Sequence, residues 1–312
     1  MTGAVRTLPA VATALAEGRA VVALESSVLA QGLPVPSNRT AALSMLRAVE
    51  SHGAVAAITA VVRGIPAAGL TDGELDRFLA RDGIEKVSAR DLAHAVARGI
   101  DGATTVAAAI ALAKLAGIEV LATGGIGGVH RAPPYDESAD LAELARTPII
   151  VVCSGAKAIL DLRATAERLD TLGVSVVGYR TAELPAFYGS ESGIAVPRVD
   201  EVADVVAVYT AQRALGRSSA LLVVQPPPSP FALPAAVVER AVVEGVREST
   251  RAGIHGSAVT PFLLTYVDKA TSGRAREVNL ALLEQNAALA AAIAVALARP
   301  GALPLISALP SY

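Results

Sequence analysis

The feature that most constrains the fold is a set of short apolar runs, rich in β-branched residues, that recur through the first two thirds of the chain. These runs span residues 20–24, 54–62, 118–122, 148–153, 174–178 and 220–224. Such runs are typical of buried strands. Most are separated by helical patterns, at 38–51, 90–98, 102–116, 138–146, 155–171 and 200–215. This alternation predicts a three-layer α/β/α sandwich around a largely parallel mixed sheet.

The last third of the chain is mostly helical in pattern. Its helical segments cover 233–252, 259–270 and 277–298. A proline-rich stretch at 225–230 precedes them and suits either a linker or a loop. We therefore expect a helical C-terminal third.

Composition excludes several classes of function. The formal net charge is −2 and no basic stripe stands out, which argues against binding to nucleic acid. A single cysteine excludes an internal disulfide and a multi-thiolate zinc site. The N-terminus lacks the pattern of a signal peptide. The longest apolar stretches, near 103–113 and 287–298, are too short to cross a bilayer. We therefore expect a cytoplasmic protein without a membrane partner.

The apolar character of the chain indicates subunit interfaces. Mean hydropathy is +0.49 and only 18% of residues are charged. Obligate interfaces resemble a domain core cut in half, so they would bury much of this excess. We expect an oligomer.

Polar residues follow three of the predicted strands. Glu25 ends the first, Thr123 the third and Ser154 the fourth. In sheets of this type, ligands bind outside the carboxyl ends of the strands. The sequence therefore predicts a site at one edge of the sheet, with these residues close together.

The segment after the fourth predicted strand carries a lysine in an apolar setting. Ser154-Gly155 turns the chain, and Lys157 then opens an apolar helical pattern. A lysine in the first turn of a helix faces the positive end of the dipole, and apolar neighbours desolvate it. Both effects favour a neutral amine that can attack carbon. The alternative is a solvated lysine beside a strand–helix turn.

Two segments suit an anion. The GGIGG run at 124–128 does not fit the spacing of a dinucleotide-binding motif, but glycines permit close backbone approach or positive φ. The GATTV run at 102–106 sits at a predicted helix start, where free amides and hydroxyls suit phosphate. A tight turn and ordinary helix capping are the alternatives. Lys86 precedes another polar helix start.

Three carboxylates lie within five residues, at Asp136, Glu137 and Asp140. A cluster of oxygen ligands without nearby thiols suits a hard cation such as manganese or magnesium. Acidic residues at a helix N-terminus also occur as ordinary caps.

The remaining candidates are one histidine, two asparagines and the cysteine. His130 is the only histidine inside a site motif, so a nucleophilic triad has little support. Asn279 and Asn286 share one otherwise apolar helix face, where one reaches into the site or both serve helix packing. Cys153 lies inside an apolar strand, which indicates a core residue.

A series of motifs carries a family resemblance. In chain order they are ALESS (23–27), KVSARDL (86–92), GATTVA (102–107), ATGGIGGVHR (122–131), DESADL (136–141), VVCSGAKAILD (151–161), PAFY (185–188), TPFLL (260–264) and NAALA (286–290). Together they resemble the pseudouridine-5'-phosphate glycosidase family, also called indigoidine synthase A-like. The resemblance covers about residues 8–298. It implies one domain over 1–312, with the proline-rich stretch as a loop beside the site and no attached kinase domain.

The resemblance also implies the chemistry. The family cleaves the C–C glycosidic bond of pseudouridine 5'-phosphate reversibly, giving uracil and ribose 5-phosphate. Glu25 is then the acid that opens the ribose ring, and Lys157 forms an adduct at C1' of the opened sugar. Asp136 binds one manganese ion per subunit, although Glu137 stands where the family has an aliphatic residue. Contacts to this small nucleotide come from Lys86, Val106, Ser138, Ala139 and Asp140, to which the residue arguments above add Thr123, His130 and Asn279.

Two further implications are a homotrimer and a role in pseudouridine catabolism. The lysine and phosphate features also fit two other functions. One is a Schiff-base aldolase or lyase acting on a phosphosugar. The other is a catalytically idle nucleotide-phosphate sensor, against which the joint presence of Glu25, Asp136 and Lys157 argues.

Overall fold

The framework of the protein is a large, mostly parallel sheet. A computed structural model describes residues 5–131, 135–254 and 256–299. In spatial order, the main strands are β1 (Arg6–Thr7), β4 (Ile65–Ala68), β3 (Val55–Val62), β2 (Val21–Leu24), β7 (Val120–Ala122), β9 (Ile150–Cys153), β13 (Leu221–Val224), β11 (Ser175–Tyr179) and β12 (Arg198–Val199). Strand β6 (Asp101–Thr104) branches from β3 and pairs with β5 (Ile84–Val87). Within this sheet, the antiparallel pairs of the named strands are those that β3 makes with β4 and with β6. The predicted mixed, largely parallel sheet is confirmed.

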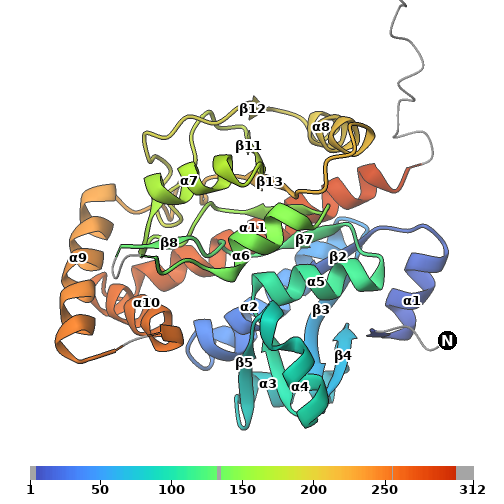
Figure 1. The fold of residues 1–312 in the computed structure, drawn as a ribbon, viewed down its shortest axis with the longest axis horizontal. Helices are drawn as coiled ribbons and strands as arrows, with labels where there is room; N and C mark the ends of the chain where they lie inside the picture. Colours follow the sequence, from blue (N-terminus) through green and yellow to red (C-terminus); the bar gives the residue numbers. More distant parts are fainter. Residues whose placement is uncertain (1–4, 132–134, 255, 300–312) are drawn as a thin grey trace, which may run out of the picture.

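Helices cover both faces of the sheet, which confirms the three-layer sandwich (Figure 1). Helices α2 (Ser37–Ser51) and α11 (Arg274–Leu297) pack together on one face, and α5 (Val106–Ala116) packs with α6 (Ala139–Arg146) on the other. The other helices are α1 (Pro9–Ala16), α3 (Asp72–Ala80), α4 (Leu92–Arg98), α7 (Leu162–Thr171), α8 (Val202–Ala214), α9 (Ala235–Arg251) and α10 (Val259–Ala270). Short helical turns are η1 (Val28–Gly32, a π-helix), η2 (Ala89–Asp91) and η3 (Gly256–Ala258).

The central strands read as continuous apolar runs because both faces are covered. Every residue of β2, β9 and β13 is buried. Parallel strands sandwiched between helices have this composition. Cys153 is fully buried at the end of β9, and burial raises the pKa of its thiol to about 12. Its assignment as a core residue is confirmed.

Helix α11 is the one helix in the described ranges that is long and apolar enough to span a membrane, judged by length and composition alone. The expectation that the apolar stretch near 287–298 is too short was therefore wrong, since it continues a helix of 24 residues. Yet α11 packs against α2, β7 and β9, as a core helix does.

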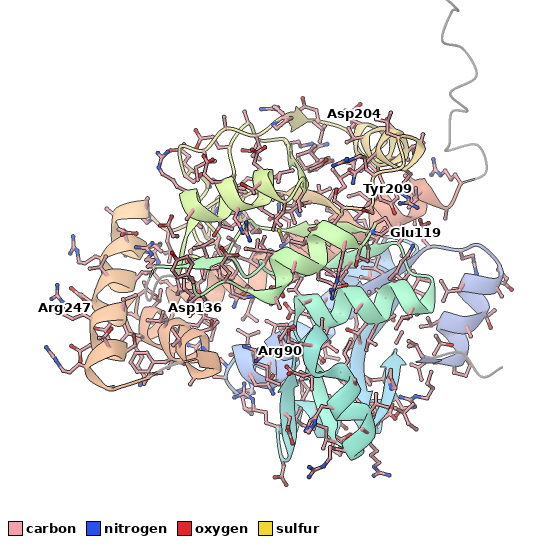
Figure 2. All side chains as sticks on the ribbon, viewed as in Figure 1. Arg90, Glu119, Asp136, Asp204, Tyr209 and Arg247 are labelled. Atoms are coloured by element: carbon pink, nitrogen blue, oxygen red, sulfur yellow. The ribbon has the colours of Figure 1, made fainter. Side chains whose placement is uncertain are left out.

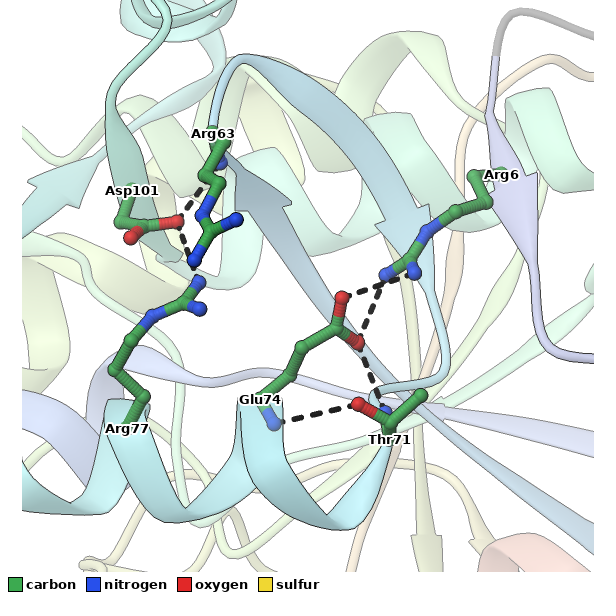
Figure 3. Close-up of polar contacts among 6 residues, drawn as sticks. All are labelled: Arg6, Arg63, Thr71, Glu74, Arg77 and Asp101. Carbon is green, nitrogen blue, oxygen red and sulfur yellow. Dashed lines mark hydrogen bonds and ion pairs between the residues drawn. The ribbon is translucent and has the colours of Figure 1, made fainter.

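Helix α3 fastens the outer strands to the rest of the sheet (Figure 3). A capping box starts it: Glu74 N–H donates to Thr71 Oγ1 at 3.3 Å, and the Glu74 carboxylate accepts from Thr71 N–H at 2.9 Å. Arg6 of β1 also binds Glu74, at 2.9 Å. At the other end of the helix, Arg77 binds Asp101 of β6 at 2.9 Å. These contacts tie β1 and β6 to helix α3, and β6 leads into the candidate site.

Two predicted helices begin later than expected. Residues 102–104 belong to β6, and α5 starts only after the Thr105 cap. Likewise α7 starts at Leu162, so residues 155–161 are not helical. That segment instead pairs with the glycine-rich loop: β10 (Leu160–Asp161) lies antiparallel to β8 (Val129–His130). Tertiary strand pairing overrides the local helical pattern in both places.

Candidate active site

A cavity of about 380 Å³ opens at the carboxyl edge of the sheet. The structure brings ten of the eleven site residues predicted from the sequence to its walls: Glu25, Lys86, Val106, His130, Asp136, Ser138, Ala139, Asp140, Lys157 and Asn279. Figure 2 labels Asp136 and, on another wall, Arg90 of η2. The remaining predicted residue, Thr123, does not line the cavity. The expected convergence at one edge is therefore correct.

Glu25 follows β2 and is only 4% exposed. Both of its carboxylate oxygens accept hydrogen bonds from hydroxyls. Thr123 Oγ1 donates to Oε1 at 2.5 Å, and Ser27 Oγ donates to Oε2 at 2.7 Å. The carboxyl group is thus held in one orientation at the floor of the cavity.

Lys157 lies in a loop, so the helix-dipole argument made for it was wrong. Its backbone N–H donates to the carbonyl of Ile126 at 3.0 Å, which explains why the chain does not coil here. Gly155 makes the preceding turn with φ +84°, and a Cβ at this position would overlap the Pro185 carbonyl oxygen. The Lys157 amine has no hydrogen-bond or ion-pair partner among the described residues, and the half-buried side chain lines the cavity.

Lys86 and Val106 form a cationic corner of the cavity. Lys86 lies in β5, whose register places Val87 opposite Thr104, two residues before Val106. The backbone N–H of Val106 has no acceptor in the described part of the chain and lies in the first turn of α5, where anions bind. Burial lowers the pKa of Lys86, the Lys157 amine lowers it further, and Glu25 and Asp140 oppose both effects.

The glycine-rich loop is closely packed against its neighbours. None of its four glycines, at 124, 125, 127 and 128, has a positive φ. A Cβ on Gly125 would meet the Phe187 ring at 2.6 Å, and one on Gly127 would overlap Ser138. The amide of Gly127 is already engaged, because it donates to Asp140 Oδ2 at 2.7 Å. The interpretation of these glycines as providers of positive φ was therefore wrong.

Asp140 ties three elements together at the wall of the cavity. It is 4% exposed at the start of α6, after the Ser138 cap. Its Oδ1 accepts from Ala107 N–H in α5 at 2.9 Å, while Oδ2 accepts from the Gly127 amide. The Thr104 hydroxyl, another expected phosphate ligand, is fully buried and donates to the Thr59 carbonyl at 2.9 Å. Its role is structural.

Asp136 and His130 lie side by side across a backbone hydrogen bond, in which His130 N–H donates to the Asp136 carbonyl at 2.9 Å. Burial lowers the pKa of His130, the Asp136 carboxylate raises it, and Lys157 and Lys86 lower it again. The side chain of Asp136 has no protein partner among the described residues. Glu137 also lines the cavity, and its carboxylate binds Arg168 at 2.9 Å.

No group of three His, Cys, Asp or Glu side chains converges as a metal site within the described residues. One unpartnered carboxylate facing a cavity nevertheless fits a hard cation that keeps most of its water ligands. The Asp136 position is therefore compatible with a hydrated manganese or magnesium ion.

The two asparagines of α11 differ in their roles. Asn279 lines the cavity, is 6% exposed, and its Oδ1 has no donor among the described residues. Asn286 is fully buried and bridges strand ends: its Nδ2 donates to the Thr123 carbonyl at 2.9 Å, and its Oδ1 accepts from Gln225 at 2.9 Å. Asn279 is the one that reaches the site.

Some cavity residues were missed by sequence reasoning. Gln31 comes from the π-helix η1, and π-helices are frequent at functional sites. Phe187 has a left-handed backbone, φ 63°, and packs on Gly125. Leu264 lines the cavity from α10. Phe187 and Leu264 lie in motifs that carried the resemblance, so a signal existed, whereas nothing marked Gln31.

The fold and the site together define a class: an α/β sandwich with a buried carboxylate, a lysine without an acidic partner and a cationic corner in one cavity. The sequence matches the family described as indigoidine synthase A like protein over residues 10–296, and the chain belongs to this family.

Similar proteins include some with a more specific name and two whose solved structures share this fold. A pseudouridine-5'-phosphate glycosidase of Gemmatimonas aurantiaca is 59% identical over 285 residues, covering 91% of this chain and 93% of that protein. A pseudouridine-5'-phosphate glycosidase of Thermus thermophilus is 52% identical, and the match covers 89% of this chain and 97% of that protein. An indigoidine synthase A-like protein of Thermotoga maritima superposes with a TM-score of 0.86 at 37% identity, covering 91% and 94%. The structure of a prealnumycin C-glycosynthase, AlnA, in complex with ribulose 5-phosphate superposes with a TM-score of 0.87 at 40% sequence identity. The match covers 94% of this chain and 97% of AlnA.

Proposed function

We propose that this protein cleaves the C–C glycosidic bond of pseudouridine 5'-phosphate reversibly, yielding uracil and ribose 5-phosphate. The observation that carries the proposal is the joint presence in one cavity of Glu25 and a Lys157 amine without an acidic partner. The names of the relatives support the same substrate. The reaction suits pseudouridine catabolism.

The first step opens the ribose ring. Glu25 gives a proton to the ring oxygen as the bond between this oxygen and C1' breaks, and uracil supplies the electrons. A carbon leaving group departs less readily than the oxygen or nitrogen groups of ordinary glycosidases, which use two carboxylates. Ring opening therefore prepares C1' for covalent catalysis by a nucleophile.

The second step uses Lys157 as the nucleophile. The nitrogen lone pair of Lys157 adds to C1' of the opened sugar, and the electrons return to uracil. Protonation of uracil C5 then lets the C–C bond break while the lysine lone pair forms an imine at C1'. Water hydrolyses the imine and releases ribose 5-phosphate.

Binding groups surround these two residues. Lys86 and the free amide of Val106 suit the 5'-phosphate, because a cation and a helix N-terminus both attract anions. The Asn279 side chain lines the cavity, and its amide suits hydrogen bonding to uracil. His130 and Ser138 complete the wall between them.

Manganese is the proposed metal, with Asp136 as its protein ligand. When bound, the ion supplies positive charge and oriented water molecules near the substrate. In this scheme the protein's own residues still open the ring and attack C1'.

The decisive experiment incubates purified protein with pseudouridine 5'-phosphate and manganese and measures released uracil. Borohydride added during turnover should trap one ribose 5-phosphate adduct on the peptide that carries Lys157. Lys157→Arg should be inactive because a guanidinium stays protonated.

An adduct on another lysine, such as Lys86, or an active Lys157→Arg variant would refute the lysine mechanism. Trapping of ribose 5-phosphate without any uracil release would favour a phosphosugar aldolase or lyase. Ligand binding without either reaction would favour the nucleotide sensor.

A further inference from the structure

Thr123 lies behind Glu25, on the side away from the cavity. It follows β7 and is 1% exposed. Glu25 and Ser27 line the cavity, whereas Thr123 does not. Its hydroxyl donates to Glu25 Oε1 at 2.5 Å. Thr123 was expected to contact substrate, but its position rules out direct contact in this structure.

The backbone of Thr123 is fixed from two sides. Its N–H donates to the Val152 carbonyl of β9 at 3.0 Å, and its carbonyl accepts from Asn286 of α11 at 2.9 Å. The hydroxyl has no second partner in the described part of the chain. Strand β7 and helix α11 thus hold a single donor against one oxygen of Glu25.

The second donor to Glu25 differs in kind. Ser27 lines the cavity and lies just before the π-helix η1. It reaches Oε2 at 2.7 Å. The two oxygens of Glu25 are therefore distinguishable: Oε1 faces the protein interior through Thr123, and Oε2 lies on the Ser27 side with the cavity.

We propose that Thr123 is a positioning residue, which holds Oε1 so that Oε2 delivers the proton to the ribose ring oxygen. This inference rests on the proposed function. In the step itself, the Oε2–H bond breaks as the bond from the ring oxygen to C1' breaks, and the proton moves to the ring oxygen. The carboxylate that remains accepts a stronger hydrogen bond from Thr123 than the acid does, because charge-assisted bonds are about twice as strong. Thr123 thus favours the transition state over the ground state.

The test is Thr123→Val, which keeps the shape and removes the hydroxyl. We expect kcat to fall about three- to tenfold, because the variant loses only the gain in strength of this hydrogen bond as the acid becomes a carboxylate, about half of a full bond to a charged group. KM should stay within about twofold, since no substrate contact is lost. Thr123→Ser should recover most of kcat because it restores the donor.

The matched control is Thr210→Val on α8. Thr210 is also buried, at 6% exposure, and its hydroxyl has no partner among the described residues. It should keep wild-type kcat. If Thr123→Val unfolds, Thr123→Ala and Thr123→Ser provide the same comparison in a smaller side chain.

Wild-type kcat in Thr123→Val, or a Thr123→Ser variant as slow as Thr123→Val, would overturn the inference. In these cases the wild-type protein still releases uracil, so the proposed function stands. Absence of uracil release by the wild type would instead overturn the function.

Discussion

At the scale of single residues, the two asparagines of α11 separate function from stability. Asn286→Ala removes the hydrogen bonds that a fully buried amide makes to Gln225, to Ser154 and to the Thr123 carbonyl. Each unsatisfied buried group costs about 1–3 kcal/mol, so we expect the free energy of unfolding to drop by about 2–4 kcal/mol. Asn279→Ala removes an acceptor that has no donor in the described structure, so stability should be kept while uracil release falls.

Urea unfolding and uracil release, measured on both variants, check this pair. The expected pattern is a stable, slow Asn279→Ala and a destabilised Asn286→Ala. The reverse pattern would mean that the assignment of Asn279 to the cavity and Asn286 to the core is wrong.

A second residue pair tests the metal proposal. Chelation should abolish most uracil release, and manganese should restore it. Asp136→Ala should need at least about tenfold more manganese, the loss typical of removing even an outer partner of a metal ligand. Glu137→Ala is the matched control, because its carboxylate binds Arg168 and should leave the metal requirement unchanged. Full activity of Asp136→Ala in chelator would remove this residue from the reaction.

At the scale of elements, we propose that β5 and the start of α5 together bind the phosphate. Lys86 has a lowered pKa, so the folded chain binds this proton less readily than the unfolded chain. The folded state therefore loses stability as the pH falls below the ordinary lysine pKa, and Lys86 is unfavourable for folding at neutral pH. Lys86→Met should unfold at the same temperature as the wild type or higher, without ligand.

With a phosphate ligand bound, the wild type should instead unfold at a higher temperature than Lys86→Met. At a hundred times its Kd, ribose 5-phosphate should stabilise the wild type by about 2.7 kcal/mol, and Lys86→Met much less. Ribose without phosphate is the control and should stabilise neither. Thermal unfolding at pH 7, with and without ligand, measures the stabilisation of the wild type and of the variant. Equal stabilisation of the variant would show that the phosphate lies elsewhere.

Elements were predictable from the sequence where burial on both sides dictates composition. The apolar runs that became β2, β9 and β13 are examples, since each residue there faces a helix layer. Strand β5, with Glu85 and Lys86, has no such run and depends on pairing with β6. The lysine loop is similar: the apolar residues after Gly155 have a helical pattern, but they pair with the segment before His130.

The candidate site was also predictable only in part from the sequence. Parallel strands end at one edge, so the sequence order of Glu25 and Ser154 sufficed to bring their segments together. Which side of Glu25 a neighbour occupies is set by strand register, and this is why Thr123 was assigned to substrate contact. The engaged amide of Gly127 was likewise invisible without the position of Asp140.

At the scale of the whole molecule, the apolar composition predicts assembly, and we propose a homotrimer. Mean hydropathy is +0.49, and large apolar side chains remain exposed in the described structure, such as Leu115 at 61% and Leu215 at 75%. Scattered apolar residues are normal on a monomer, so the prediction rests on their combination with a low charge content. Light scattering at micromolar concentration should give three times the chain mass of 31.6 kDa. The mass should hold on dilution, because obligate interfaces are large and apolar. A mass of one chain at that concentration would refute assembly, and a stable dimer would refute the trimer while keeping the interface argument.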